Sequence, residues 1–291
     1  MIALQNVSAR RAPLALAGIT LSWDAGVHAV VGAPGDGGPL LLALIAGRER
    51  PRAGSVRVTD GEPTRAEVRP RIAHVPLHPV LPEALRVDEV LRTAAAIRGD
   101  APSDPAARLA LLGVESLARR PVRSLFVEEV HTVALAEALT SSRAQVLLLE
   151  EPLLALDPRA TSRVAEAIRA RAREGRAVVL ATASLRDAAE LADDHVLLRG
   201  GKVVGRGGSG IDGLAVPADG VRLRIVASDP QELLAAVASE ETVEAVARRG
   251  AAVIVRGRSP SALAEAVGRA VTISGVEITE LRFELPSEKS P

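Results

Sequence analysis

Glycines cluster between residues 32 and 38, after the short apolar segment 27–31 and before Pro39 and the apolar run LLLALIAG. A strand, a glycine loop and a helix in this order can cradle phosphate groups. Backbone N–H groups converge on the anion, and the helix N-terminus adds about half a positive charge. The segment therefore predicts a phosphate-binding loop. The alternative is a tight turn that only connects a strand to a helix, and the loop alone favours that alternative.

The loop departs from the phosphate-binding pattern G-x-x-x-x-G-K-[ST] at the positions that carry its chemistry. Its glycines fall in register, but Gly38 stands where the lysine belongs and Pro39 stands where the magnesium-binding Ser/Thr belongs. Asp36 also places a negative charge beside the expected phosphate. A dinucleotide-binding loop fits worse, because G-x-G-x-x-G starting at Gly35 would require glycine at Leu40. The candidate loop residues are Gly32, Ala33, Pro34, Gly35, Asp36, Gly37, Gly38, Pro39 and Leu40.

Two adjacent carboxylates, Glu150 and Glu151, follow the apolar segment 145–149. A carboxylate pair at a strand end can hold Mg²⁺, which prefers oxygen ligands. Glu150 is the candidate metal ligand and Glu151 the candidate catalytic residue. Because the glycine loop lacks its phosphate clamp, we favour the alternative of a solvated or salt-bridged pair. The histidines show no metal-ligand spacing, and we interpret them as structural; they are His28, His74, His78, His131 and His195.

The surrounding elements predict an α/β fold. Buried strands are expected at residues 27–31, 72–76, 145–149 and 177–182, and helices at residues 87–98, 105–112, 127–139, 158–174 and 185–192. A hairpin is expected at 195–205. Strands that alternate with helices indicate a largely parallel sheet covered on both faces. The alternating polarity of residues 2–10 and 16–24 adds an antiparallel β layer.

A second region follows the glycine-rich segment 205–213, which we predict to be a linker. Its expected elements are a strand at 221–227, a helix at 230–239, strands at 243–247 and 252–255, a helix at 261–269 and a strand at 276–285. This βαββαβ order is ferredoxin-like. We therefore expect two domains, 1–213 and 214–291, and a frayed end at 286–291.

Composition excludes several classes of function. The 291 residues contain no cysteine, so disulfide scaffolds, Cys-ligated zinc sites and cysteine nucleophiles are excluded. The 36 basic residues balance the 36 acidic residues, and aromatic residues make up 1%. The chain therefore has neither the basic field nor the stacking platforms of nucleic-acid binding. No signal peptide is visible, and the longest apolar runs fall far short of the ~20 residues that span a bilayer.

Taken in chain order, the motifs resemble those of ATP-binding-cassette (ABC) ATPases. LLLEEP followed by LDP, within residues 147–158, is similar to the Walker B strand, catalytic glutamate and D-loop. The glycine loop falls at the Walker A position, and the resemblance covers residues 2–206. It implies a P-loop NTPase-like nucleotide-binding domain with a parallel sheet, an antiparallel β subdomain and a helical subdomain. The C-terminal region resembles the small appended domain of ABC-2-type exporter subunits, without that domain's usual acidic, aromatic ending.

The resemblance also implies where chemistry is lost. Leu77 occupies the Q-loop position, Ala183 the switch-histidine position, and Asp157 keeps the D-loop aspartate. No aromatic residue stands near residues 9–11, where the family stacks adenine. The signature position holds Leu125, Phe126, Val127, Glu128 and Glu129. Two carboxylates would face the phosphate there, and like charges 4 Å apart repel by ~4 kcal/mol at an effective dielectric of 20.

The resemblance therefore implies an ABC-2-type exporter subunit that is a pseudo-ATPase scaffold or regulator, with weak or no binding of ATP and Mg²⁺. Two alternatives remain open: an active ATP-hydrolysing exporter subunit with a non-standard site, and a soluble binding module with no transporter. The implied partners are a membrane permease, contacted through residues 77–125, and a second subunit. That subunit completes a homodimer, or a heterodimer with a motif-complete ABC ATPase in which no standard site would form. We expect a cytoplasmic location at the inner face of the cell membrane.

Overall fold

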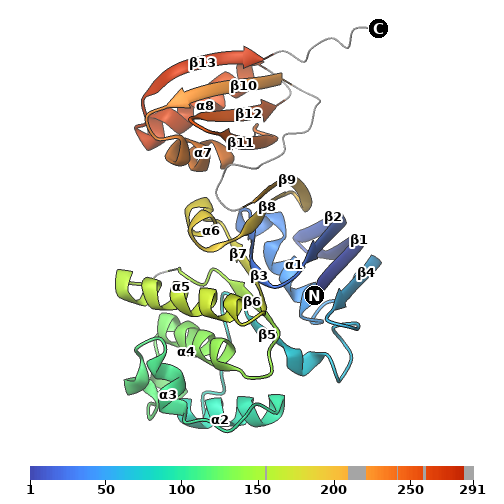
Figure 1. Ribbon diagram of the computed structural model, residues 1–291, viewed down its shortest axis with the longest axis vertical. Helices are drawn as coiled ribbons and strands as arrows, with labels where there is room; N and C mark the ends of the chain where they lie inside the picture. Colours follow the sequence, from blue (N-terminus) through green and yellow to red (C-terminus); the bar gives the residue numbers. More distant parts are fainter. Residues whose placement is uncertain (155, 209–220, 241, 258–259, 285–291) are drawn as a thin grey trace.

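A six-stranded sheet forms the centre of the first 208 residues (Figure 1). Our computed structural model describes residues 1–154, 156–208, 221–240, 242–257 and 260–284. The strand order is β5-β6-β7-β3-β8-β9, and all neighbours run parallel except β9, which pairs antiparallel with β8. The strands are β3 (Gly26–Val31), β5 (Ile72–Val75), β6 (Val146–Glu150), β7 (Ala177–Thr182), β8 (Asp194–Arg199) and β9 (Lys202–Gly208). The predicted parallel sheet and the predicted hairpin are confirmed.

Three further strands form a separate antiparallel sheet of order β2-β1-β4. They are β1 (Ile2–Arg11), β2 (Leu14–Trp23) and β4 (Ala53–Val58). The expected antiparallel layer is therefore present, but the sequence pattern missed β4. Helix α1 (Gly38–Ile45) contacts this sheet on one side and β6 and β7 of the central sheet on the other.

Both faces of the central sheet are buried. Successive side chains of a strand point to opposite faces, so each strand contributes to two cores. Ala29, Leu147 and Leu149 belong to the core on the side of α4, α5 and α6. Val30 and Leu148 belong to the core on the side of α1 and the antiparallel sheet. Strands that are apolar at every position, such as VLLL, satisfy both cores at once.

The remaining helices of this part of the chain cover one face and one end of the central sheet (Figure 1). They are α2 (Val87–Arg98), α3 (Pro105–Ala110), α4 (Val127–Thr140), α5 (Pro158–Arg173) and α6 (Leu185–Leu191). All five were predicted, with ends that differ by a few residues. None of the helices in the described ranges is long and apolar enough to cross a membrane.

The C-terminal region is a four-stranded antiparallel sheet with two helices (Figure 1). Its elements are β10 (Val221–Ala227), α7 (Pro230–Ala238), β11 (Ala245–Arg249), β12 (Ala252–Gly257), α8 (Pro260–Ser274) and β13 (Ile278–Glu284). The strand order is β11-β12-β10-β13, and both helices contact the sheet. The predicted linker 205–213 is wrong for residues 205–208, which end β9 and pair with β8. The rest of the predicted linker, the predicted boundary after residue 213 and the predicted frayed end at 286–291 lie outside the described residues.

Candidate functional site

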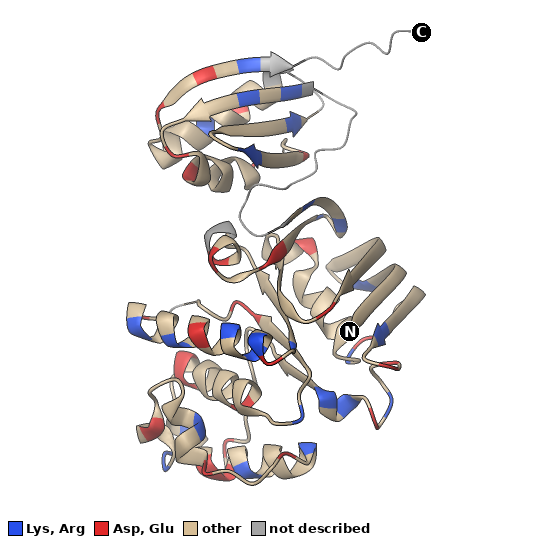
Figure 2. Cartoon of the chain, viewed as in Figure 1, with Lys and Arg blue, Asp and Glu red and all other residues tan. Residues whose placement is uncertain are grey.

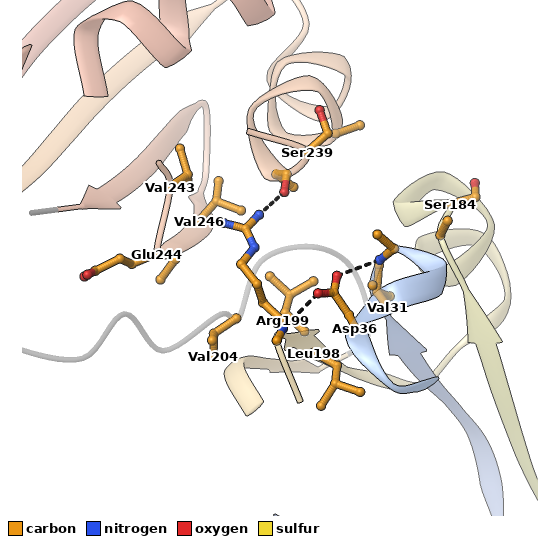
Figure 3. A pocket seen from close by; sticks show the side chains of 18 of the residues that line it. Val31, Asp36, Ser184, Leu198, Arg199, Val204, Ser239, Val243, Glu244 and Val246 are labelled. Atoms are coloured by element: carbon orange, nitrogen blue, oxygen red, sulfur yellow. Dashed lines mark hydrogen bonds between the residues drawn. The ribbon is translucent and has the colours of Figure 1, made fainter. Parts of the chain in front are cut away.

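The glycine loop joins β3 to α1 and contains a short 3-10 turn, Pro34–Asp36. The side chain of Asp36 folds back into the loop, where Oδ2 accepts a hydrogen bond from the Ala33 amide at 2.8 Å. Its other oxygen, Oδ1, accepts from the amide of Gly200 in the β8–β9 turn at 2.8 Å (Figure 3). One backbone N–H of the loop and one of the β8–β9 turn therefore donate to an anion, and this anion is a carboxylate of the same chain.

Packing requires one of the loop glycines, Gly32, and backbone conformation requires another, Gly37. A Cβ on Gly32 would lie 2.5 Å from the carbonyl oxygen of Leu198. Gly37 has a φ of 103°, and a Cβ there would lie 2.8 Å from Cδ2 of Leu16. Such contacts and such a φ exclude side chains. The retained glycines thus have a structural cause that does not involve phosphate.

The residues at the phosphate position of the glycine loop do not fit a nucleoside triphosphate with its magnesium ion. Gly38 brings no cation, and Pro39 brings neither a hydroxyl nor a backbone N–H. The Asp36 carboxylate takes up one loop amide. It would repel a phosphate charge 4 Å away by about 4 kcal/mol at an effective dielectric of 20. Among the described residues, no group of three or more His, Cys, Asp or Glu side chains could hold a metal ion.

The candidate metal ligand Glu150 is hydrogen-bonded to His74 on β5 and to Leu77 in the segment that follows β5. Oε1 lies 3.1 Å from Nε2 of His74, and Oε2 accepts from the Leu77 amide at 3.0 Å. Burial raises the pKa of Glu150, but the hydrogen bonds from His74 and Leu77, with the charges of His74 and Arg11, outweigh it and hold the pKa below its ordinary value. The acid is ionised and has two protein partners.

The candidate catalytic residue Glu151 is bound to the end of β7. Oε2 accepts from the hydroxyl of Thr182 at 2.8 Å, and Oε1 accepts from the amide of Ala183 at 2.7 Å. Glu151 adopts a φ of 45°, the left-handed region that costs a side-chain-bearing residue energy. Ala183, at the switch-histidine position, therefore contributes its backbone to this acid.

The signature position lies at the start of α4 and differs from the expectation in one respect. Glu129 does not face outward, because Oε2 accepts from the Phe126 amide at 2.9 Å and Oε1 pairs with Arg120 at 2.6 Å. It closes the first turn of the helix. Glu128 remains exposed, and so do Phe126 and Val127, whose exposed fractions are 71% and 65%.

The D-loop aspartate, Asp157, is the N-cap of α5. Its Oδ1 accepts from the amides of Arg159 and Ala160 at 2.8 and 2.9 Å. These bonds lower the pKa of Asp157. An aspartate directly before Pro158 is itself an N-cap signal, so the sequence could have predicted this role.

Buried histidines occupy structural positions. His28 stacks on Trp23 with ring centroids 5.8 Å apart, and its Nδ1 lies 2.9 Å from Oδ2 of Asp194. Burial lowers the pKa of His28, but the bonds to Asp194 and to the Asp24 carbonyl outweigh it and raise the pKa. Burial lowers the pKa values of His131 and His195.

A cavity of about 880 Å³ opens between the glycine loop and the C-terminal region. Its walls include Ala33 and Asp36 from the loop, and Ala235 and Val246 from α7 and β11. Arg199 also lines it (Figure 3). Sequence analysis did not single out Arg199, because nothing in its local pattern distinguishes it from the other arginines.

Elsewhere, Figure 2 shows acidic and basic positions interspersed along α2 and α5, in keeping with the net charge of zero.

Comparison with known proteins gives consistent matches. The family profile of the ABC transporters matches residues 16–154. The hemin import ATP-binding protein HmuV of Streptomyces coelicolor is 38% identical, over 66% of this chain and 72% of that protein. The daunorubicin resistance ATP-binding protein DrrA3 of Streptomyces coeruleorubidus is 30% identical, over 77% of this chain and 72% of that protein.

Other relatives are much longer than this chain. A putative ABC transporter ATP-binding protein of Streptomyces coelicolor is 38% identical, but the match covers 62% of this chain and only 32% of that protein. Among solved structures, an ATP-binding subunit of an ABC transporter has a TM-score of 0.65 at 23% identity, over 72% of this chain and 90% of that chain. A dimeric ATP-binding cassette bound to ADP and Pi has a TM-score of 0.64 at 18% identity, over 72% and 99%. These similarities support the fold of the first 208 residues.

Proposed function

Because the chain belongs to the ATP-binding proteins of ABC transporters, we propose that it is a transporter subunit that has lost ATP turnover and acts as a scaffold or regulator. The observation that carries this proposal is the position of Asp36, whose carboxylate accepts hydrogen bonds from the Ala33 and Gly200 amides. In the family, a domain of this kind binds ATP and Mg²⁺. In this chain, the loop that would receive the phosphates is supplied with an anion of its own.

Losses at the other positions support the same proposal. Phosphoryl transfer depends on positioning and on stabilising charge, and removing one oriented donor typically costs about 3 kcal/mol, or a hundredfold in rate. Gly38 and Pro39 remove a cation and a hydroxyl, and Leu77 and Ala183 remove two polar side chains. Glu150 and Glu151 have hydrogen-bonding partners within the protein. We therefore propose that nucleotide binding is weak or absent and that Glu151 is inactive.

We further propose that the transporter is an exporter of the ABC-2 type. The C-terminal region supports this, because its element order is βαββαβ and its strand order is β11-β12-β10-β13, as in a ferredoxin-like domain. We accordingly assign residues 214–291 to that domain and residues 1–213 to the nucleotide-binding domain. The drug-resistance relative supports the exporter assignment, although import proteins also match this chain.

The proposed partners are a membrane permease and a second ABC subunit, at the cytoplasmic face of the membrane. Phe126 and Val127 support the second partner, because two adjacent, largely exposed apolar side chains are typical of a protein contact. They stand where the family presents its signature to the other subunit. Contact with the permease is assigned to residues 77–125, which include α2 and α3.

Isothermal titration with Mg-ATP tests the loss of nucleotide binding. We expect no heat of binding below millimolar ATP and no phosphate release above the buffer rate. The matched control for hydrolysis is Glu151→Gln: any residual activity should be the same in this variant, because it then comes from a contaminant. Micromolar ATP binding together with turnover that Glu151→Gln abolishes would refute the proposal.

Co-purification tests the partner assignment. The paired substitutions Phe126→Ser and Val127→Ser should reduce recovery of the second ABC subunit with the tagged protein. Ile273→Ser is the matched control, because Ile273 is 80% exposed but lies on α8. Equal recovery of the second subunit with all variants would show that Phe126 and Val127 are not part of the interface. Absence of any permease from the complex would favour a binding module without a transporter.

A further inference from the structure

The glycine loop is bonded to the β8–β9 turn through a single residue. Asp36 accepts from the Gly200 amide through Oδ1 at 2.8 Å and from the Gly201 amide through its backbone carbonyl at 3.1 Å. The same turn is held against β2, because the Ala17 amide donates to the Gly201 carbonyl at 2.9 Å. The turn and β2 are closely packed, since a Cβ on Gly201 would lie 2.1 Å from the Ala15 carbonyl oxygen.

The residue next to that turn reaches the C-terminal region. Arg199 donates from Nη1 to the carbonyl of Glu240 at 3.1 Å and from Nη2 to the carbonyl of Ala238. Figure 3 shows the Arg199 side chain reaching toward the segment that includes Ser239. These carbonyls lie at and just beyond the C-terminal end of α7, where the helix dipole favours a cation. Glu240 is also paired with Arg269 of α8 at 2.7 Å, so the bonded path extends to both helices of the region.

Electrostatic attraction between Asp36 and Arg199 acts in addition to the hydrogen bonds that connect the loop, the β8–β9 turn and α7. Burial lowers the pKa of Arg199, and the negative charge of Asp36 opposes this effect. Asp36 therefore satisfies the loop amide, holds the turn and stabilises the cation that binds α7. A phosphate in the loop would have to compete with all three interactions.

We propose that Asp36 is a built-in anion that replaces phosphate in the glycine loop, and that the loop and Arg199 together form the joint on which the C-terminal domain docks. The proposal goes beyond the loss of ATP turnover, because it gives the former phosphate loop a function that needs no nucleotide. The cavity beside the joint is the space between the docked parts, with walls from both.

Hydrogen exchange of the full chain in nucleotide-free buffer tests the joint. Asp36→Asn keeps the size of the side chain but replaces one acceptor by a donor, and Arg199→Met removes the guanidinium. In each variant, amides of the Gly200–Gly201 turn and of residues 236–240 should exchange about tenfold faster, the factor expected for one lost hydrogen bond. The double variant should exchange little faster than the stronger single variant, because both act on one path.

Matched controls are Asp60→Asn and Arg173→Met, which alter exposed ion pairs with Arg71 and Glu166. They should leave both segments unchanged. If Asp36→Asn accelerates the turn but leaves residues 236–240 at the wild-type rate, the loop is not the joint and the proposal is overturned. This result would be independent of whether the wild type binds ATP.

If a variant is too unstable for hydrogen exchange, the distance between two spin labels gives a second measurement. The chain has no cysteine, so Ile97→Cys and Ile273→Cys, both at exposed positions, place one label in each part. The distance distribution should be narrow in the otherwise unaltered chain and broad once Asp36→Asn is added. An unchanged narrow distribution in the Asp36 variant would also overturn the proposal.

Discussion

Oε1 of Glu150 lies 3.1 Å from Nε2 of His74, and both side chains are 10% exposed or less. The other carboxylate oxygen accepts from the Leu77 amide, so a single acid on β6 holds the end of β5 and the segment that follows it. A carboxylate that could have been a metal ligand is therefore part of the internal hydrogen bonding of the sheet.

Replacing this acid should destabilise the fold. Glu150→Ala leaves two part-buried donors without their acceptor, and we expect the free energy of unfolding to fall by about 3 kcal/mol. Glu150→Gln keeps one acceptor oxygen for Leu77 and should cost about 1 kcal/mol. Urea unfolding measures both values, with the exposed Glu83→Ala as control. Equal stability of Glu150→Ala and wild type would show that the pair is not structural.

The sequence indicated a salt-bridged or solvated pair but could not identify His74. His74 stands 76 residues before Glu150, and the two meet because β5 and β6 are neighbours in the sheet. Hydrophobic periodicity predicts each strand but not the order of strands. The partners of Glu151 were equally undetermined, because Thr182 and Ala183 lie at and just after the end of β7.

The buried histidines should make stability fall in mild acid. Burial lowers the pKa values of His131 and His195, so in the fold both take up protons at a lower pH than in the unfolded chain, where the ordinary value is 6.5. Each group then reduces the free energy of unfolding by up to about 1.4 kcal/mol per pH unit. The variant His131→Gln/His195→Gln should show a smaller loss between pH 7 and pH 5 in urea unfolding. An identical loss would contradict the assignment.

His28 should act in the opposite direction. Its pKa is raised in the fold, so its contribution is fully present below the unfolded value of 6.5 and is lost as the pH rises through the folded pKa. Asp194→Asn removes the charge that raises the pKa. This variant should therefore lose more stability at pH 6 than at pH 8. A loss that is the same at both values would mean that the Asp194 charge does not act on His28.

Glycines of the loop and of the β8–β9 turn can be tested by their different surroundings. Gly32→Ala brings a Cβ to 2.5 Å from the Leu198 carbonyl, and Gly201→Ala brings one to 2.1 Å from the Ala15 carbonyl. We expect each to lose about 2–3 kcal/mol of stability. Gly35→Ala is the matched control, since a Cβ there meets nothing within 4 Å. Thermal unfolding of the nucleotide-free protein measures these losses of stability. If Gly32→Ala is as stable as the wild type, the packing explanation is wrong.

The fold was more predictable than the site, for a physical reason. Strands such as β6 and β7 are apolar at every position before their last residues, Glu150 and Thr182, and α5 has an N-cap and a glycine, Gly175, shortly after its end. Strand β4 was missed because only Val56 and Val58 of its six residues are buried. The part played by Arg199 depends on a tertiary contact with α7, which leaves no local trace in the sequence.

Restoring the lost residues tests whether Asp36 itself excludes phosphate. A Cβ on Gly38 would meet Ala181 Cβ at 3.5 Å and Val30 Cγ1 at 3.9 Å, which are ordinary contacts, so the backbone at this position leaves room for a Cβ. Gly38→Lys combined with Pro39→Ser returns the clamp and the hydroxyl. With Asp36 in place, we still expect weak Mg-ATP binding by isothermal titration.

Adding Asp36→Ala to this pair should raise the affinity for Mg-ATP at least tenfold. The reason is that the carboxylate no longer repels the phosphates, a term of about 4 kcal/mol at 4 Å before screening by solvent. Asp60→Ala in the same background is the control, because Asp60 is exposed and lies outside the loop. If the paired variant binds as tightly with Asp36 as without it, the absence of lysine and serine alone accounts for the weak binding that we propose, and the carboxylate is only a structural contact.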